Sequence, residues 1–216
     1  MLPTVPATQQ SHSDSRIGLG TMLSHRPLRG ALVLVLLAAP LGSASFATIG
    51  HLVHEVGLNT SFSLFAVASM AAGNGLGRLA FGALADRYGA PFSRSVVLSV
   101  NALAATIILV VLYGRFHIFF IAYPLLIGLS FGGMAGKLPS LAAHVVEDGH
   151  VETAFGLLFG VFAFASFLGP LISSVFGMNN ALTAFAITAA AAWLRTMVKP
   201  DHRRKQLSES LGQTIP

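Results

Sequence analysis

Long apolar segments separated by short polar stretches fill most of this chain. The apolar segments occupy about residues 30 to 53, 61 to 84, 95 to 113, 117 to 139, 153 to 176 and 179 to 198. A helix needs about 20 predominantly apolar residues to cross a bilayer, so the pattern predicts six transmembrane helices. The segments are too long and too continuous for the alternating strands of about ten residues that build a membrane barrel. We therefore predict an all-α integral membrane protein.

Composition agrees with a lipid environment. Of the 216 residues, 54% are apolar and only 10% are charged, with a mean hydropathy of +0.72, so a water-soluble globular domain is excluded. Twelve spans do not fit this length. The chain has no cysteine, so no disulfide framework or thiolate metal site is expected. We expect no metal and no cofactor.

Basic residues indicate how the helices are oriented. The formal charge is +5, but Lys and Arg lie beside the apolar segments, so we expect no nucleic acid partner and interpret them as topology signals. Cytoplasmic termini place nearly all of them inside and only Arg115 outside. We predict a cytoplasmic N-terminal tail over residues 1–28, a six-helix transmembrane domain over 29–198 and a basic cytoplasmic C-terminal tail over 199–216. The expected location is a cell membrane, either a plasma membrane or a bacterial inner membrane.

Two segments of the chain are similar to each other. Residues 38 to 46 read AAPLGSASF and residues 122 to 131 read AYPLLIGLSF, each with a proline that we expect near the middle of a span. Matching breaks in two halves are typical of transporters built as inverted repeats, here three spans plus three. The alternative is chance, because Pro and Gly are frequent in membrane helices.

The most unusual stretch closes the second span. Residues 73 to 90 read GNGLGRLAFGALADRYGA, where the glycines permit a neighbouring helix to approach closely. Asp86 can accept from amides at a helix start, and Arg87 can donate to carbonyls at a helix end. Gly82, Asp86, Arg87 and Gly89 could thus latch one conformation. The alternative is a topological anchor in which Arg87 holds the loop inside.

This stretch resembles the loop signature of the major facilitator superfamily, in which Gly, three residues, Asp, Arg, one residue and Gly precede basic residues. Ala90 departs from the signature where a basic residue is usual. The Gly-Asn-x-x-Gly-Arg that precedes it is similar to the second half of a facilitator, as are residues 128 to 148 and 155 to 171. The resemblance covers about residues 25 to 198, and the N-terminal tail resembles the linker between halves.

The resemblance implies a secondary active transporter that works by alternating access, with the 82 to 89 loop steadying one side of the cycle. A full facilitator has two six-span halves, and only the second is similar to this chain. Transport therefore implies a second six-helix half as partner, either a separate chain or a second copy, or a longer parent chain. The alternatives are a non-transporting truncated fragment and a membrane subunit of another transporter.

Arg78 is the strongest candidate for substrate binding. It falls about two turns inside the second span, where insertion of a cation costs about 2.5 to 3.5 kcal/mol. Asn74 lies one turn earlier, and we expect both to face the bundle interior with Gly82. A guanidinium can bind a carboxylate through two hydrogen bonds. The alternative is a structural arginine that snorkels to the interface or pairs with Asp86.

The monocarboxylate and oxalate/formate exchange branches resemble the Arg78 segment most closely, with an arginine implicated in anion binding at the matching position. This resemblance implies a small organic anion, such as a monocarboxylate, as substrate. The monocarboxylate branch commonly has an acid where this chain has Asn74. That departure puts the same proton coupling in question.

Three polar residues at the outer end of the first span, His51, His54 and Glu55, are spaced to share a proton. They are our candidates for proton coupling, with a headgroup-level polar cluster as the alternative. We expect Lys137 to snorkel at the inner end of the fourth span and Asn101 to bond across helices.

An enzyme is the other class that the sequence raises. Gly128, Ser130 and Gly132 form G-x-S-x-G in the fourth span, as in a candidate intramembrane serine protease. Such a serine needs a histidine base, and the sixth span contains none. We therefore expect packing and no catalysis from these residues.

Overall fold

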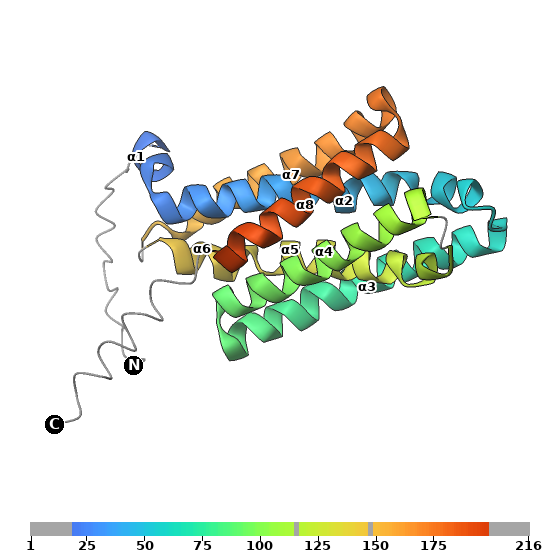
Figure 1. The fold of residues 1–216 in the computed structure, drawn as a ribbon. Helices are drawn as coiled ribbons and strands as arrows, with labels where there is room; N and C mark the ends of the chain where they lie inside the picture. Colours follow the sequence, from blue (N-terminus) through green and yellow to red (C-terminus); the bar gives the residue numbers. More distant parts are fainter. Residues whose placement is uncertain (1–18, 115–116, 147–148, 199–216) are drawn as a thin grey trace, which may run out of the picture.

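The computed structural model describes residues 19–114, 117–146 and 149–198. Within these ranges the chain is all-helical without strands, which confirms the predicted fold class at that level. Figure 1 shows the helices gathered in one elongated bundle. The elements are α1 (Leu19–Ser24), α2 (Arg26–Glu55), α3 (Thr60–Tyr88), α4 (Ala90–Gly114), the 3-10 helix η1 (His117–Ile121), α5 (Tyr123–Gly136), α6 (Leu138–Val145), α7 (Val151–Phe176) and α8 (Met178–Val198).

Several of these helices are suited to a membrane. Four of them, α2, α3, α4 and α7, are long and apolar enough to cross one, and α5 with α6 adds a fifth if this bent pair counts as one span. α8 is outside this set. α8 is 21 residues long, or about 31 Å of helix, but the polar residues Asn179 and Asn180 and the charged Arg195 border its apolar centre. A multi-pass membrane protein is thus supported, and the count of six is not confirmed.

The fourth predicted span is not a continuous helix over 117 to 139, so this prediction is wrong. η1 comes first, α5 then begins at Tyr123, and a bend of 46° separates α5 from α6. Pro124 and Pro139 each stand in the first turn of a helix, where the missing amide hydrogen has no helical partner to lose. Pro124 is therefore not at mid-span. Lys137, at the bend, is only 3% exposed, so the expected snorkelling is also wrong.

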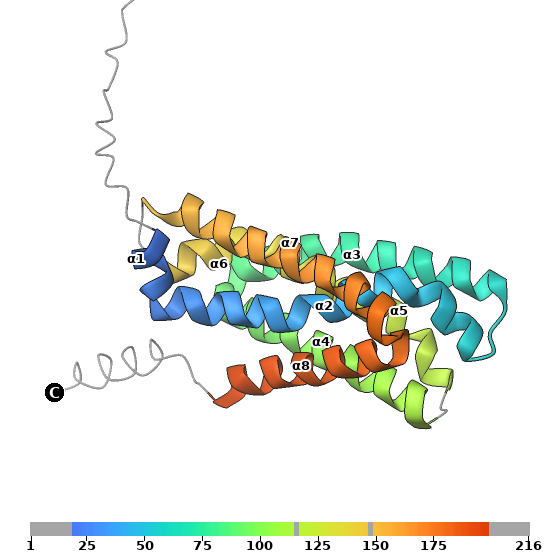
Figure 2. The same ribbon diagram turned by 90° about the horizontal axis from the view of Figure 1, so that it is seen from above.

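Three helix pairs have the most extensive contacts. α3 lies along α5, α2 along α7, and α4 along α8. Figure 2 shows α2 running between α7 and α8. Within the most apolar 18-residue stretch of α2, 61% of the residues are buried. The same measure is only 28% for α3 and 22% for α7. In α3 and α7, therefore, most residues of this stretch are not fully buried by the described part of the chain.

Polar side chains fix α2 near its internal proline, Pro40. Asn101 on α4 donates from Nδ2 to the carbonyl oxygen of Ala38 at 3.1 Å, and Thr188 on α8 donates to that of Leu37 at 3.1 Å. The bond of Asn101 confirms its expected role across helices. Tertiary contacts thus hold α2 within three residues of the proline, where a helix is weakest.

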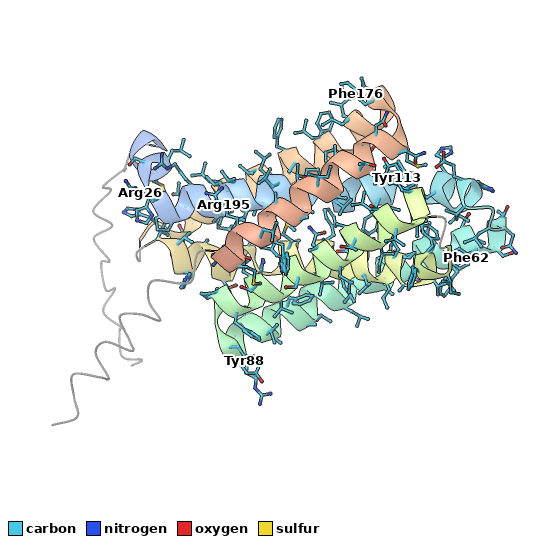
Figure 3. All side chains as sticks on the ribbon, viewed as in Figure 1. Arg26, Phe62, Tyr88, Tyr113, Phe176 and Arg195 are labelled. Carbon is cyan, nitrogen blue, oxygen red and sulfur yellow. The ribbon has the colours of Figure 1, made fainter. Side chains whose placement is uncertain are left out.

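The two ends of the bundle differ in charge. Figure 3 shows Arg26, Tyr88 and Arg195 at one end, here called the basic end, and Phe62, Tyr113 and Phe176 at the other, here called the opposite end. The first described helix and the end of α8 both lie at the basic end (Figure 1). The two ends of the long helical region 19–198 therefore lie at the same end of the bundle.

The predicted tails are only partly within the described residues. Residues 1–18, the tail over 199–216 and Arg115 lie outside them. Residues 19 to 28, assigned to the N-terminal tail, form α1 and the start of α2, with Met22 and Leu28 buried.

Candidate functional site

α3 and α5 meet backbone to backbone through glycines. A methyl group at Gly73 would lie 2.6 Å from the carbonyl oxygen of Leu125, and one at Gly77 would overlap the carbonyl oxygen of Leu129. On α5, Gly132 faces the backbone of Asn74 in the same way. Glycines four residues apart lie on one helix face, so these two helices approach more closely than any side chain would allow. The expected close approach is confirmed for this face of α3.

The other glycines of α3 have no such contact. A methyl group at Gly75 or Gly82 would meet nothing within 4 Å. Gly75 is exposed and Gly82 is half-buried. Both therefore stand on a face of α3 that no described helix of this chain covers.

Arg78 lies at the border between these two faces. Its backbone packs on α5, where a methyl group at Gly136 would lie 2.8 Å from the Arg78 Cα, but its side chain is exposed. The expectation that it faces the bundle interior is wrong, because α5 occupies the adjacent glycine face. Its position is about 15 Å along the helix from Tyr88, the end of α3. Within the described residues, its guanidinium makes no hydrogen bond or ion pair.

Asn74 is one turn before Arg78 and is half-buried against α5. Its Oδ1 is fully buried and has no hydrogen-bond partner among the described residues. An unpaired buried carbonyl costs about 1 to 3 kcal/mol. The Asn74 carbonyl oxygen and the Arg78 guanidinium therefore lie on neighbouring turns of α3 but do not hydrogen-bond to each other.

The candidate latch loop is a tight turn of one residue. α3 ends at Tyr88, Gly89 has φ +88°, and α4 begins at Ala90. The Gly89 amide donates to the carbonyl oxygen of Ala85 at 2.8 Å. A positive φ with an extended ψ is nearly restricted to glycine, so this position of the motif has a clear physical cause.

The charged residues of this loop do not form their expected bonds. Asp86 and Arg87 are both exposed, and neither makes a side-chain hydrogen bond or ion pair with another described residue. The guanidinium of Arg87 instead lies 5.5 Å from the centre of the Tyr88 ring. At the exposed end of α3 these groups face solvent or a partner, not a neighbouring helix end.

His51, His54 and Glu55 all line one pocket at the opposite end. The pocket has a volume of about 760 Å³ and lies between α2 and α7. Glu55 accepts a hydrogen bond at Oε1 from Nδ2 of Asn179 at 3.3 Å. Within the described residues, no three His, Asp or Glu side chains are placed to hold a metal ion. The complete lining is Ala47, Thr48, His51, His54, Glu55, Pro170, Ser173, Ser174 and Met178.

Sequence reasoning missed the α7 side of this pocket. Ser173 and Ser174 come about 120 residues after the histidines, and no local pattern links them. They follow Pro170 within α7. That proline is the one feature of the sequence that could have identified them as candidate site residues.

Ser130 has a packing role in the described structure. Its hydroxyl is within hydrogen-bond distance of Oδ1 of Asn101 at 3.2 Å and of the carbonyl oxygen of Ile127 at 3.1 Å, and its single hydrogen goes to one of them or is shared. Gly128 and Gly132, on either side of it, face the backbone of α3. Close helix packing therefore accounts for all three positions of the G-x-S-x-G pattern.

Comparison with known proteins adds no relative. No protein-family model, curated protein or solved structure matches this chain. Its function must be argued from its own residues and their arrangement.

Proposed function

We propose that this chain is one six-helix half of a secondary active transporter of the major facilitator type, moving a small organic anion such as a monocarboxylate by alternating access. In this proposal α5 and α6 form one broken span and α8 is the sixth. Both termini are cytoplasmic in a plasma or bacterial inner membrane. The partner is a second six-helix half, and we propose no enzymatic activity.

Matching contacts in the two halves of the chain support an inverted repeat. Exchanging the first three spans with the last three turns the pair α3 with α5 into the pair α7 with α2, and leaves α4 with α8 unchanged. These are the three most extensive pairs. Such an exchange is expected of three spans plus three related by a pseudo-two-fold axis.

The detailed contacts follow the same exchange. A methyl group at Gly73 would lie 2.6 Å from the Leu125 carbonyl oxygen and 3.0 Å from the Leu129 amide. One at Gly169 would lie 2.7 Å from the Pro40 carbonyl oxygen and 2.8 Å from the Ala44 amide. In each case a glycine of one repeat meets an oxygen and an amide four residues apart, at the similar segments that contain Pro40 and Pro124.

The observation that carries the proposed function is the position of Arg78. A guanidinium on the side of an apolar helix is stable in a membrane only if protein, water or an anion covers it. Its flank of α3 has small neighbours, Gly75 and Gly82, with open space beyond them. This is the chemistry expected of one wall of a cavity that a second half closes and that a carboxylate enters.

The candidate latch fits the same proposal. Asp86 and Arg87 are exposed at the basic end, on the helix that carries Arg78. A second half that packs on this face would bring helix ends within reach of both side chains. Their bonds would then form in one state of the cycle and break in the other.

A membrane subunit without transport activity is the second candidate. The observation that favours it is the uncovered face of α7, where a methyl group at Gly156 or Gly160 would meet nothing within 4 Å. Small residues spaced by four are typical of contacts between membrane helices. In that case the exposed faces of α3 and α7 bind another membrane protein, and no substrate crosses.

Uptake of a labelled monocarboxylate into proteoliposomes tests the proposal. We expect saturable uptake and carboxylate binding that Arg78→Ala abolishes and Arg78→Lys retains in part. Arg195→Ala is the matched control, because Arg195 is an exposed arginine at the end of α8. Folded protein that neither binds nor moves carboxylates, or an Arg78→Ala variant as active as the parent, contradicts the proposal.

A further inference from the structure

The α2 and α7 helices are in close contact at their prolines and open a pocket beyond them. Gly169 of α7 rests on the backbone of α2 at Pro40 and Ala44. The pocket begins directly after this contact, since its first lining residues are Ala47 on α2 and Pro170 on α7. Figure 1 shows the turn after α2 and the turn after α7 as separate projections at this end of the bundle. Its volume of about 760 Å³ is in the usual range for sites of small organic molecules.

The hydroxyl groups of the pocket have their hydrogens committed to the helices. Thr48 donates to the Ala44 carbonyl oxygen at 2.8 Å, and Ser173 donates to that of Gly169 at 2.9 Å. Ser174 likewise donates within α7, at 2.8 Å. A hydroxyl that donates in this way has only lone pairs left for a ligand. These three oxygens therefore accept hydrogen bonds and suit a ligand that donates them.

The charge around the pocket favours a positively charged ligand. Glu55 is its only acidic lining residue and is exposed, with Asn179 as its single described hydrogen-bond partner. α2 ends at Glu55 and α7 ends at Phe176, so two helix C-termini lie on either side of the pocket. Each brings about half a negative charge. The N-terminus of α8, which begins at Met178 beside the pocket, carries a partial positive charge that opposes them.

We propose that this pocket binds a small organic cation through its protonated amine. The ammonium group pairs with Glu55, and its remaining N–H groups donate to hydroxyl oxygens of the set Thr48, Ser173 and Ser174. A bare metal ion would leave most of the volume empty and lacks a cluster of ligands. The site goes beyond the proposed anion transport and does not depend on it, since Arg78 does not line this pocket.

Saturation-transfer NMR on the purified full chain in maltoside micelles tests the site, with empty micelles as the blank. The probes are n-butylammonium, butyrate and n-butanol, which match in length and differ in charge. At pH 8 we expect n-butylammonium to bind more tightly than butyrate or n-butanol. Butyrate or butanol binding as well as the amine would overturn the proposal.

Two variants assign the binding to this pocket. Glu55→Gln should weaken n-butylammonium about tenfold, since one charged hydrogen bond becomes neutral. Glu152→Gln, at the exposed start of α7 at the basic end, is the matched control and should change nothing. Ser174→Ala tests the hydroxyls separately and should weaken binding by a smaller factor. An unchanged affinity in folded Glu55→Gln protein rejects the site.

Arg78→Ala separates this inference from the proposed function. It should abolish carboxylate uptake and leave n-butylammonium binding intact. Loss of amine binding in Arg78→Ala would show that the pocket is not the amine site.

Discussion

Replacing Gly77 with alanine tests whether α3 and α5 are held by direct backbone contact. The added methyl group would overlap the Leu129 carbonyl oxygen and lie 2.9 Å from the Gly133 amide nitrogen. Ordinary contacts of a methyl carbon are at 3.4 to 4 Å. The two helices must therefore separate by about 0.5 Å or more, and a gap of this size removes a quarter to a half of each atomic attraction along the contact.

The magnitude follows from two opposing effects. Overpacking a tight contact costs about 1 to 3 kcal/mol, and a rigid backbone partner places Gly77 near the upper end. Alanine itself favours a helix over glycine by about 1 kcal/mol. Gly77→Ala should therefore destabilise the protein by about 2 kcal/mol. Gly75→Ala has open space, receives only the helix preference, and should stabilise it by about 1 kcal/mol.

Thermal unfolding of the two variants in the same detergent measures this difference. Trp193 is the only tryptophan and is half-buried, with its Nε1 donating to Ser99 at 2.9 Å, so its fluorescence reports loss of the bundle. About 3 kcal/mol between the variants corresponds to a melting temperature about 6 to 12 °C lower for Gly77→Ala. Melting temperatures that agree within about 2 °C would refute the backbone contact, because both variants gain the same helix preference.

Three further substitutions probe separate features of the fold. Gly89→Ala forces a side chain into a backbone conformation at φ +88° and should cost about 1 to 3 kcal/mol, whereas Gly82→Ala should not destabilise; equal melting temperatures would contradict this. Asn101→Ala removes a bond to α2 and should cost about 0.6 to 1.7 kcal/mol by the same assay, and no change would mean that this bond is not stabilising. Tyr123→Phe removes a hydroxyl 2.5 Å from that of Ser45 and should cost about 1 kcal/mol or less, since Ser45 keeps its bond within α2; a loss above about 2 kcal/mol would contradict that estimate.

The helical fold could be predicted from the sequence because lipid exposure demands long apolar segments. The glycines of α3 were predictable as a group, but their separate roles were not. Gly73 and Gly77 meet α5, whereas Gly75 and Gly82 face open space. The spacing gives the face of the helix, and only the tertiary structure shows which face has a neighbour.

The bend at Lys137 had a local sequence signal that a prediction based on the length of the apolar segment did not use. A charge followed two residues later by Pro139 interrupts the run at the place where α6 begins. The pocket at His51 had no such signal on its second wall, because Ser173 approaches from a distant part of the chain. Residues of the site that lie on one helix were therefore predictable, and those brought together by α2 and α7 were not.

The contact between α3 and α5 also sets an order for assembly in the membrane. These helices are not neighbours along the chain, because α4 lies between them. After Tyr88 the ribosome must add 48 residues to reach Gly136, which takes about 2 to 10 s at usual rates of synthesis. During that time the glycine face of α3 is not covered by α5. The mean hydropathy of α3, 1.2, is the lowest of the four single helices that are long and apolar enough to cross a membrane. Retention of α3 beside the insertion machinery until α5 emerges would keep its glycine face available for α5.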